Sequence, residues 1–148
     1  MTLQRPAILV LVVAVFILVS FLVARWLSAE NRERTAVVDL LRAQQRGDVP
    51  AMLALLDGCA RDADCRAAVE RNARSLRRSG RVRVLRVDSS TAHALLADEG
   101  PTRVAWDVGG ESLPVVQCVQ VERRGLPLLG GAIVLSGIGP RVAGDAAC

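Results

Sequence analysis

The feature that most constrains this chain is an apolar run near its N-terminus. Residues 7–24 read AILVLVVAVFILVSFLVA, and Ser20 is the only polar side chain among them. As an α-helix with a rise of about 1.5 Å per residue, the run would be about 27 Å long, close to the thickness of the hydrocarbon core of a bilayer. Arg5 and Arg25 flank it, and Trp26 lies where an aromatic interfacial anchor is expected. The run therefore predicts a membrane-spanning helix.

A cleaved secretory signal and a buried core helix are the alternatives for the same run. A signal has an apolar core of about 7–15 residues, followed by a small-x-small cleavage site. This run is longer, and the candidate sites at residues 22–24 and 27–29 each begin with leucine instead of a small residue. We expect an uncleaved signal-anchor over residues 1–27, with the lipid bilayer as the partner of residues 7–24.

The rest of the chain has little excess charge. It carries 17 arginines and 15 acidic residues, because Arg5 and Arg25 are two of the 19 basic residues and every acid follows them. Lysine is absent, a bias typical of a GC-rich bacterial coding sequence. Nucleic-acid-binding domains usually have a stronger basic patch with aromatic support. Tyrosine is absent and both phenylalanines lie in the apolar run, so no nucleic-acid partner is expected.

The four cysteines all follow the apolar run and predict two disulfides. Cys59 and Cys65 flank a short loop, whereas Cys118 lies in a predicted strand and Cys148 is residue 148 of the 148 in the sequence. Of the three possible pairings, we expect Cys59–Cys65 and Cys118–Cys148, with the second bridge pinning a tail over residues 143–148. Zinc sites usually contain closer cysteine pairs, so neither a metal nor a cofactor is predicted.

Two indications of the orientation disagree. Disulfides persist in oxidising compartments, which favours an extracytoplasmic domain on a single-pass protein of the cell membrane. However, Arg25, Arg32 and Arg34 follow the apolar run whereas only Arg5 precedes it. The positive-inside rule alone would place the domain in the cytoplasm. We expect the extracytoplasmic orientation, with the cytoplasmic one as the alternative.

Three helices are predicted in the first half of the domain. The first covers residues 28–46 and either continues from the apolar run or begins close after it, with Glu33 facing away from its buried side. Gly47 is expected to end it. That buried side comprises Val37, Leu40, Leu41 and Gln44. Asp48 is expected to cap the second helix, and the third extends to about Arg78.

The second half of the domain has the period of β-strands. Residues 81–87 alternate, with a change of phase near Leu85 that predicts a β-bulge. Further strands are expected over residues 91–97, 102–108, 113–123 and 132–138. Helices followed by an antiparallel meander are typical of an α+β fold. We expect one domain over residues 28–142, with three helices packed on a curved antiparallel sheet of four to five strands.

The start of this domain resembles the nuclear-transport-factor-2-like superfamily, and the order of elements over residues 35–142 is similar. The residues that carry the resemblance are Leu40-Leu41, Gly47-Asp48 and Met52-Leu53-x-Leu55-Leu56. It implies a curved sheet that wraps the long helix into a cone with an apolar pocket. Membrane-anchored members resemble periplasmic assembly components of type IV secretion and conjugation systems.

The same resemblance implies an enzymatic alternative, an isomerase or dehydratase that uses the cone-shaped pocket. Ketosteroid isomerase chemistry needs a carboxylate base and a tyrosine or protonated carboxyl as oxyanion donor, and this chain has no tyrosine. His93 and one of Asp88, Asp98 and Asp107 would then transfer protons. The ordinary alternatives are a structural histidine and solvated carboxylates, and no catalytic residue is predicted.

Eight arginines and one acid, Glu70, lie between positions 66 and 86. They form either a solvated face or a surface for an anionic partner, such as an envelope protein, an anionic polymer or lipid headgroups. The residues singled out for such a surface are Arg66, Arg74, Arg77, Arg78 and Arg81. The sequence thus favours a membrane-anchored, extracytoplasmic interaction or ligand-binding domain without catalytic activity.

Overall fold

The computed structural model describes residues 4–90, 99–109, 113–125, 131–143 and 147–148. Within these ranges the chain forms three α-helices, one short 3-10 helix and four strands, with the helices before the strands. The helix α1 spans Gln4–Arg46, and its described side chains are those of residues 8–24 and 31–46.

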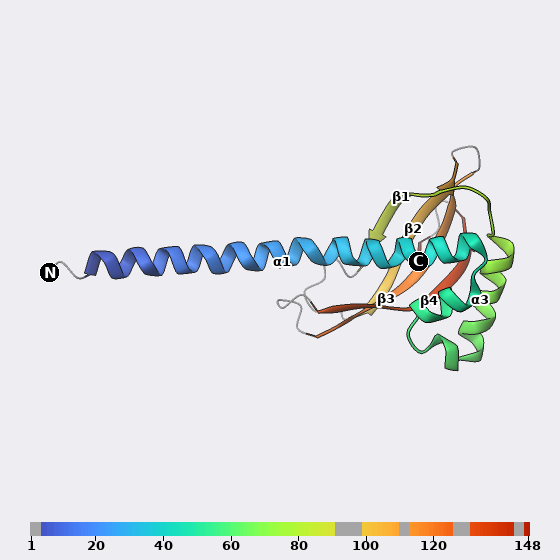
Figure 1. Cartoon of the computed structure of the whole chain (residues 1–148), viewed down its shortest axis with the longest axis horizontal. Coiled ribbons are helices and arrows are strands. Elements are labelled where there is room, and N and C mark those ends of the chain that lie inside the picture. The colour runs from blue at the N-terminus through green and yellow to red at the C-terminus, as the bar shows by residue number, and fades with distance from the viewer. Residues whose placement is uncertain (1–3, 91–98, 110–112, 126–130, 144–146) are drawn as a thin grey trace.

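The N-terminal part of α1 extends away from the rest of the chain (Figure 1). Its large apolar side chains other than Leu22, which is partly buried, are exposed in every direction around the helix, from 48% at Val13 to 71% at Phe16. Within the described residues, no helix is both long enough and apolar enough to cross a membrane.

The C-terminal part of α1 packs against the sheet and supplies one side of the core. Val37, Leu40 and Leu41 are completely buried there, as is Gln44, so the predicted buried side of this helix is confirmed. The prediction for Glu33 is wrong, because this residue is only 1% exposed. It lies four residues before Val37 and therefore on the same side of the helix.

Two short helices follow α1. Gly47 ends α1 with a φ of 72°, a left-handed conformation that glycine adopts without steric cost. The helix α2 spans Val49–Leu55, and the side chain of Asp48 caps it by accepting a hydrogen bond from the backbone nitrogen of Ala51 at 3.1 Å, as predicted. The 3-10 helix η1 then spans Cys59–Arg61.

The helix α3 spans Ala63–Ser75 and is capped by Asp62. The sequence predicted an end near Arg78, which is three residues too far. Leu76 turns out of the helical conformation and is 5% exposed in the core. The backbone nitrogen of Arg78 donates instead to the carbonyl of Gln45 at 3.0 Å, which ties the end of α3 to the end of α1.

The four strands form one antiparallel sheet in the order of the sequence. They are β1, β2, β3 and β4, which span Val82–Ser89, Glu99–Val108, Val115–Arg124 and Ala132–Val142. The pairing of β1 with β2 shifts between Val84 and Arg86, so the bulge predicted near Leu85 is confirmed. The strand predicted over residues 91–97 lies outside the described residues.

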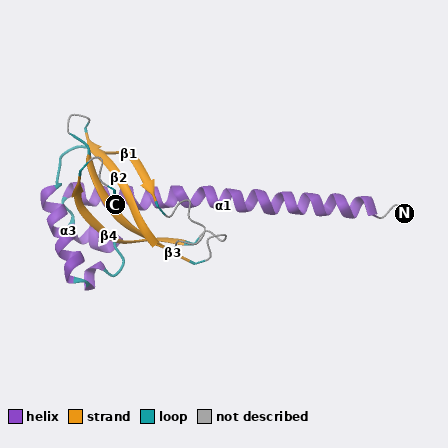
Figure 2. Ribbon diagram, turned by 180° about the vertical axis from the view of Figure 1, so that it is seen from behind, coloured by secondary structure: helices purple, strands orange, loops and turns teal. Residues whose placement is uncertain are grey.

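The predicted α+β class is confirmed, with helices packed on a four-stranded antiparallel sheet (Figure 2). Three valines of β3, Val115, Val119 and Val121, are completely buried. They pack with Trp106 of β2 and with the buried side of α1. One hydrophobic core therefore lies between the sheet and the helices.

A polar network crosses this core. The side-chain oxygen of Gln117 on β3 accepts hydrogen bonds from Gln44 Nε2 at 2.8 Å and from Trp106 Nε1 at 2.9 Å. Its amide nitrogen donates to the carbonyl of Gly139 on β4 at 3.1 Å, and Asn72 of α3 donates to the same carbonyl at 2.9 Å. The network links α1, α3 and three strands, and its hydrogen bonds offset the cost of burying these amides.

Both predicted disulfides are present, Cys59–Cys65 and Cys118–Cys148. The first joins η1 to α3, with Cα atoms 5.2 Å apart. The second joins the middle of β3 to the last residue of the tail, with Cα atoms 5.7 Å apart. The tail is thereby held to the sheet.

Candidate anion-binding surface

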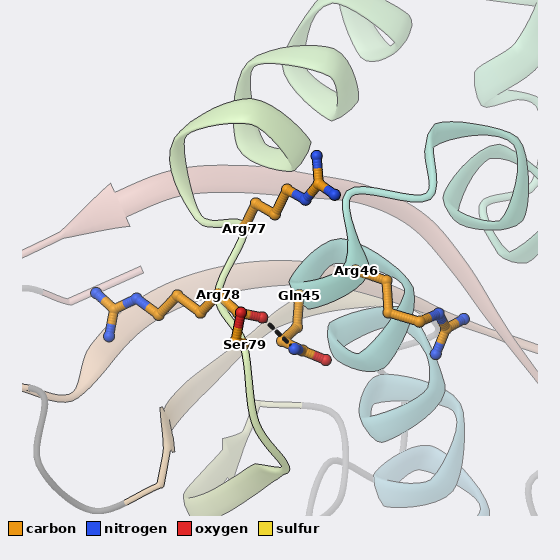
Figure 3. Close-up of a pocket in the computed structure, with 5 residues that line it drawn as sticks. All are labelled: Gln45, Arg46, Arg77, Arg78 and Ser79. Atoms are coloured by element: carbon orange, nitrogen blue, oxygen red, sulfur yellow. Dashed lines mark hydrogen bonds between the residues drawn. The ribbon is translucent and has the colours of Figure 1, made fainter.

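A basic cavity of about 620 Å³ lies where the ends of α1 and α3 meet. It is lined by Gln45 and Arg46 from α1 and by Arg77, Arg78 and Ser79 from the segment between α3 and β1 (Figure 3). Of the five arginines predicted for an anionic partner, the structure brings Arg77 and Arg78 into this cavity. We call the five lining residues the arginine surface.

Two features hold the halves of the arginine surface together. Gln45 Nε2 donates a hydrogen bond to the carbonyl oxygen of Arg78, and the Gln45 carbonyl accepts one from the Arg78 backbone nitrogen at 3.0 Å. Gly47 permits the close approach, since a Cβ atom at this position would lie only 3.2 Å from Cδ of Arg77. The backbone of this region is therefore fixed, while Arg46 and Arg77 are exposed.

The three guanidinium groups spread outward and do not converge on one point. Arg46 and Arg78 extend in opposite directions, with Arg77 between and above them (Figure 3). Arg46 Nη2 lies 3.9 Å from Asp48 Oδ2, a long and exposed ion pair that contributes little stability. No acid forms an ion pair with Arg77 within the described ranges. The surface therefore presents several separate positive charges.

The other arginines of the predicted surface have different surroundings. Arg66, Arg74 and Arg81 are exposed but do not line the cavity. Arg74 lies 3.9 Å from Glu70 across one turn of α3. The sequence missed the contribution of Arg46, because the cluster was defined by neighbours in the sequence and Arg46 reaches it only through the fold.

Two further arginines of the run between positions 66 and 86 are bound to carboxylates on the sheet. The hydrogen bonds from Arg83 to Asp107, at 3.0 and 2.8 Å, hold the pKa of that carboxyl below its ordinary value. The pKa of Asp88 is likewise lowered, chiefly by the hydrogen bond from Arg86 at 2.7 Å, and Arg103 adds to the effect at 3.3 Å. Arg83 and Arg86 therefore form ion pairs with carboxylates of the sheet and do not line the cavity.

A second, more apolar cavity adjoins the arginine surface. It has a volume of about 380 Å³ and lies between α1 and α2. Arg46 lines both cavities, and Leu55, which is 39% exposed, lines the second. Its remaining lining residues are Asp39, Arg42, Ala43, Ala51 and Ala54. We call this cavity the α1–α2 groove.

The sequence also did not predict a buried carboxylate at the other end of the domain. Glu33 of α1 accepts hydrogen bonds from Thr102 at 2.6 Å, from Ser89 at 3.1 Å and from Arg123 at 3.4 Å. These partners lie on β2, β1 and β3. Thr102 is itself completely buried, and the side chain of Arg123 is 15% exposed. This cluster anchors α1 to the sheet.

Of the four residues named for the enzymatic alternative, the structure describes Asp88 and Asp107. His93 and Asp98 lie outside the described residues. Asp88 and Asp107 are ionised partners of arginines, as the lowered pKa values indicate. Among the residues that the structure describes, no three His, Cys, Asp or Glu side chains are grouped so as to hold a metal ion.

Comparison with known proteins finds no family model that matches the chain, no similar curated protein and no similar solved structure.

Proposed function

We propose that this chain is a membrane-anchored interaction domain without catalytic activity, and that its arginine surface binds an anionic partner. The observation that carries the anchor is the exposure of apolar side chains on every side of α1 between Ile8 and Val23. A helix on the surface of a soluble domain has a polar side, whereas a helix that is apolar all round needs an apolar environment.

The apolar run in the sequence supports the same proposal. The described apolar side chains of this part end at Ala24, and the run in the sequence extends from residue 7 to residue 24. A continuous helix satisfies its own backbone hydrogen bonds, which a hydrocarbon environment requires. We therefore propose the lipid bilayer as the partner of residues 7–24, within an anchor over residues 1–27.

We further propose that the domain lies on the extracytoplasmic side of the cell membrane. The two disulfides support this placement, because such bridges persist in oxidising compartments. The arginines that follow the apolar run favour the opposite side. We give the bridges more weight, since there are two of them in separate parts of the domain. One joins η1 to α3, and the other joins β3 to the tail. The resemblance to the nuclear-transport-factor-2-like superfamily stays a prediction.

Reporter fusions test this placement. With alkaline phosphatase fused after Cys148, we expect enzyme activity, and we expect no signal from a reporter that works only in the cytoplasm. The opposite pattern would overturn the extracytoplasmic placement while leaving the anchor intact.

Extraction of membranes with alkaline carbonate tests the anchor separately. We expect the unaltered chain to stay in the membrane pellet. Replacing Leu11 and Phe16 with arginine should release it, since each arginine near the centre of a spanning helix costs about 2.5–3.5 kcal/mol. The matched control replaces the exposed Leu85 and Leu113 with arginine and should leave the chain in the pellet. Release of the unaltered chain would refute the anchor.

A further inference from the structure

We infer that the arginine surface and the α1–α2 groove together bind an acidic segment of a partner protein that also carries an apolar side chain. This inference rests on the proposed interaction function and names the partner class. Its first ground is continuity, because Arg46 lines both cavities. A ligand that contacts Arg46 in the first cavity therefore lies next to the α1–α2 groove, because the same arginine lines that groove.

The two cavities differ in chemistry. The arginine surface offers guanidinium groups, which bind carboxylates through paired N–H donors. The α1–α2 groove offers Ala51, Ala54 and the exposed Leu55, which can remove an apolar side chain from water. A polymer with charge alone would use only the first cavity. An acidic protein segment with one apolar residue would use both.

The charges nearby favour exchange with an incoming carboxylate. Arg42 pairs with Asp39 at 3.2 Å and Arg46 with Asp48 at 3.9 Å, and all four side chains are 41–58% exposed. Such solvent-exposed pairs are weak, so a ligand carboxylate can replace either acid at little cost. Because the guanidinium groups spread apart, they fit several carboxylates along an extended segment better than one small anion.

The continuous helix also separates this surface from the proposed membrane. From Ala24 to Arg46 the helix rises about 33 Å, and screening by salt limits surface electrostatics to about 8–10 Å at moderate ionic strength. The arginine surface lies at the end of α1 remote from the apolar part (Figure 1). The headgroups of the bilayer that holds the anchor are therefore out of its reach, and its ligand is a separate molecule.

Peptide binding to the full chain tests the inference. The chain is placed in nanodiscs of zwitterionic lipid, and fluorescence anisotropy is measured at low salt with two labelled probes. One probe is Glu-Glu-Leu-Glu-Glu and the other is five glutamates. We expect the leucine probe to bind about tenfold more tightly, the effect of partly burying one leucine side chain. Raising the salt concentration should weaken the binding of both probes.

Variants separate the two cavities. Arg46→Gln with Arg77→Gln should weaken the binding of both probes about tenfold. Leu55→Ser should weaken the leucine probe about threefold to tenfold and leave the five-glutamate probe unchanged. The matched control, Arg61→Gln with Arg71→Gln, removes the same charge from exposed positions outside both cavities and should change neither affinity.

Each contrary outcome has a distinct meaning. Equal affinity for the two probes would overturn the inference in favour of an anionic polymer, and the proposed interaction function would stand. No binding of either probe at low salt would refute both the inference and the anionic partner. The membrane anchor is tested by extraction and does not depend on either result.

Discussion

Arg123 on β3 and Glu33 on α1 form an ion pair across 90 sequence positions, with Nη2 of the arginine 3.4 Å from Oε2 of the glutamate. Glu33 is on the same side of α1 as Gln44, and 11 residues correspond to about three turns of the helix. Gln44 is hydrogen-bonded to Gln117 of β3. The helix that leads to the proposed anchor is thus held to β3 by polar contacts at two positions along the helix axis, at Glu33 and at Gln44.

Replacing Glu33 with alanine should lower the free energy of unfolding by about 3–5 kcal/mol, because the guanidinium of Arg123 would remain largely buried without its counter-charge. The hydroxyl of Thr102 would also lose its acceptor. Denaturant unfolding of the full chain in detergent micelles measures the loss. Glu70→Ala is the matched control. It breaks an exposed pair with Arg74 and should cost about 0.5 kcal/mol or less.

Removing both charges distinguishes an ion pair from a merely packed glutamate. The double variant Glu33→Leu with Arg123→Leu should be more stable than Glu33→Ala, since no unpaired charge is then buried. If the double variant were less stable than the single one, the ion pair would not explain the cost.

Gln117→Leu should destabilise the core although leucine is apolar and similar in size. The indole nitrogen of Trp106 and the amide of Gln44 would lose their shared partner in a buried site. An unsatisfied buried polar group costs about 1–3 kcal/mol, so we expect a loss of about 2–6 kcal/mol for the two groups. The unfolding free energy of the full chain measures it. Adding Gln44→Leu should recover part of the loss, and no recovery would contradict the shared hydrogen bond.

The helices were the more predictable part of this fold. Their apolar spacing and caps are local signals, so the buried side of α1 and the cap at Asp48 could be predicted. The bulge near Leu85 in β1 was predictable for a similar reason, because the alternation of side chains changes phase there. The disulfide pairing was also predictable, because only one of the three pairings closes the short loop between Cys59 and Cys65.

The polar centres could not be predicted with the same means. Glu33 looks like a solvated residue until Thr102 and Arg123 are placed beside it, and both are brought there only by strand pairing. Its spacing from Val37 was the one local signal. In the same way, Arg46 joins Arg77 only through the contact between the ends of α1 and α3.

The ion pair between Arg83 and Asp107 should make stability depend on pH. The pKa of Asp107 is lowered in the folded chain, so its contribution is present above the unfolded value of about 4 and is lost as pH falls through the lower folded value. Asp107→Asn should therefore destabilise the chain at pH 6 and have a shrinking effect below pH 4. Unfolding curves of both proteins from pH 6 to pH 2 give the difference.

The partner of that aspartate supplies the control. Arg83→Gln should destabilise the chain at pH 6 more than Asp107→Asn does, because it leaves a carboxylate that is only 5% exposed without its counter-charge. Its deficit should also shrink in acid, as protonation removes the unpaired charge. A deficit that stays constant from pH 6 to pH 2 in both variants would contradict the role of the ion pair.

The two disulfides should contribute unequally to stability. In the chain-entropy model, the Cys118–Cys148 bridge, with a separation of 30 residues, stabilises the fold by about 3–4 kcal/mol. The Cys59–Cys65 bridge, with a separation of 6, contributes about 2 kcal/mol on the same basis. Replacing both cysteines of a bridge with alanine should thus lower the free energy of unfolding more for the long loop.

Burial of Cys59 works against this order, since its loss from the core adds a packing cost to the short-loop variant. Cys65→Ala alone, which keeps Cys59 in place, corrects for that cost. A smaller loss for the long-loop variant than for Cys65→Ala would show that the tail contributes little to holding the sheet.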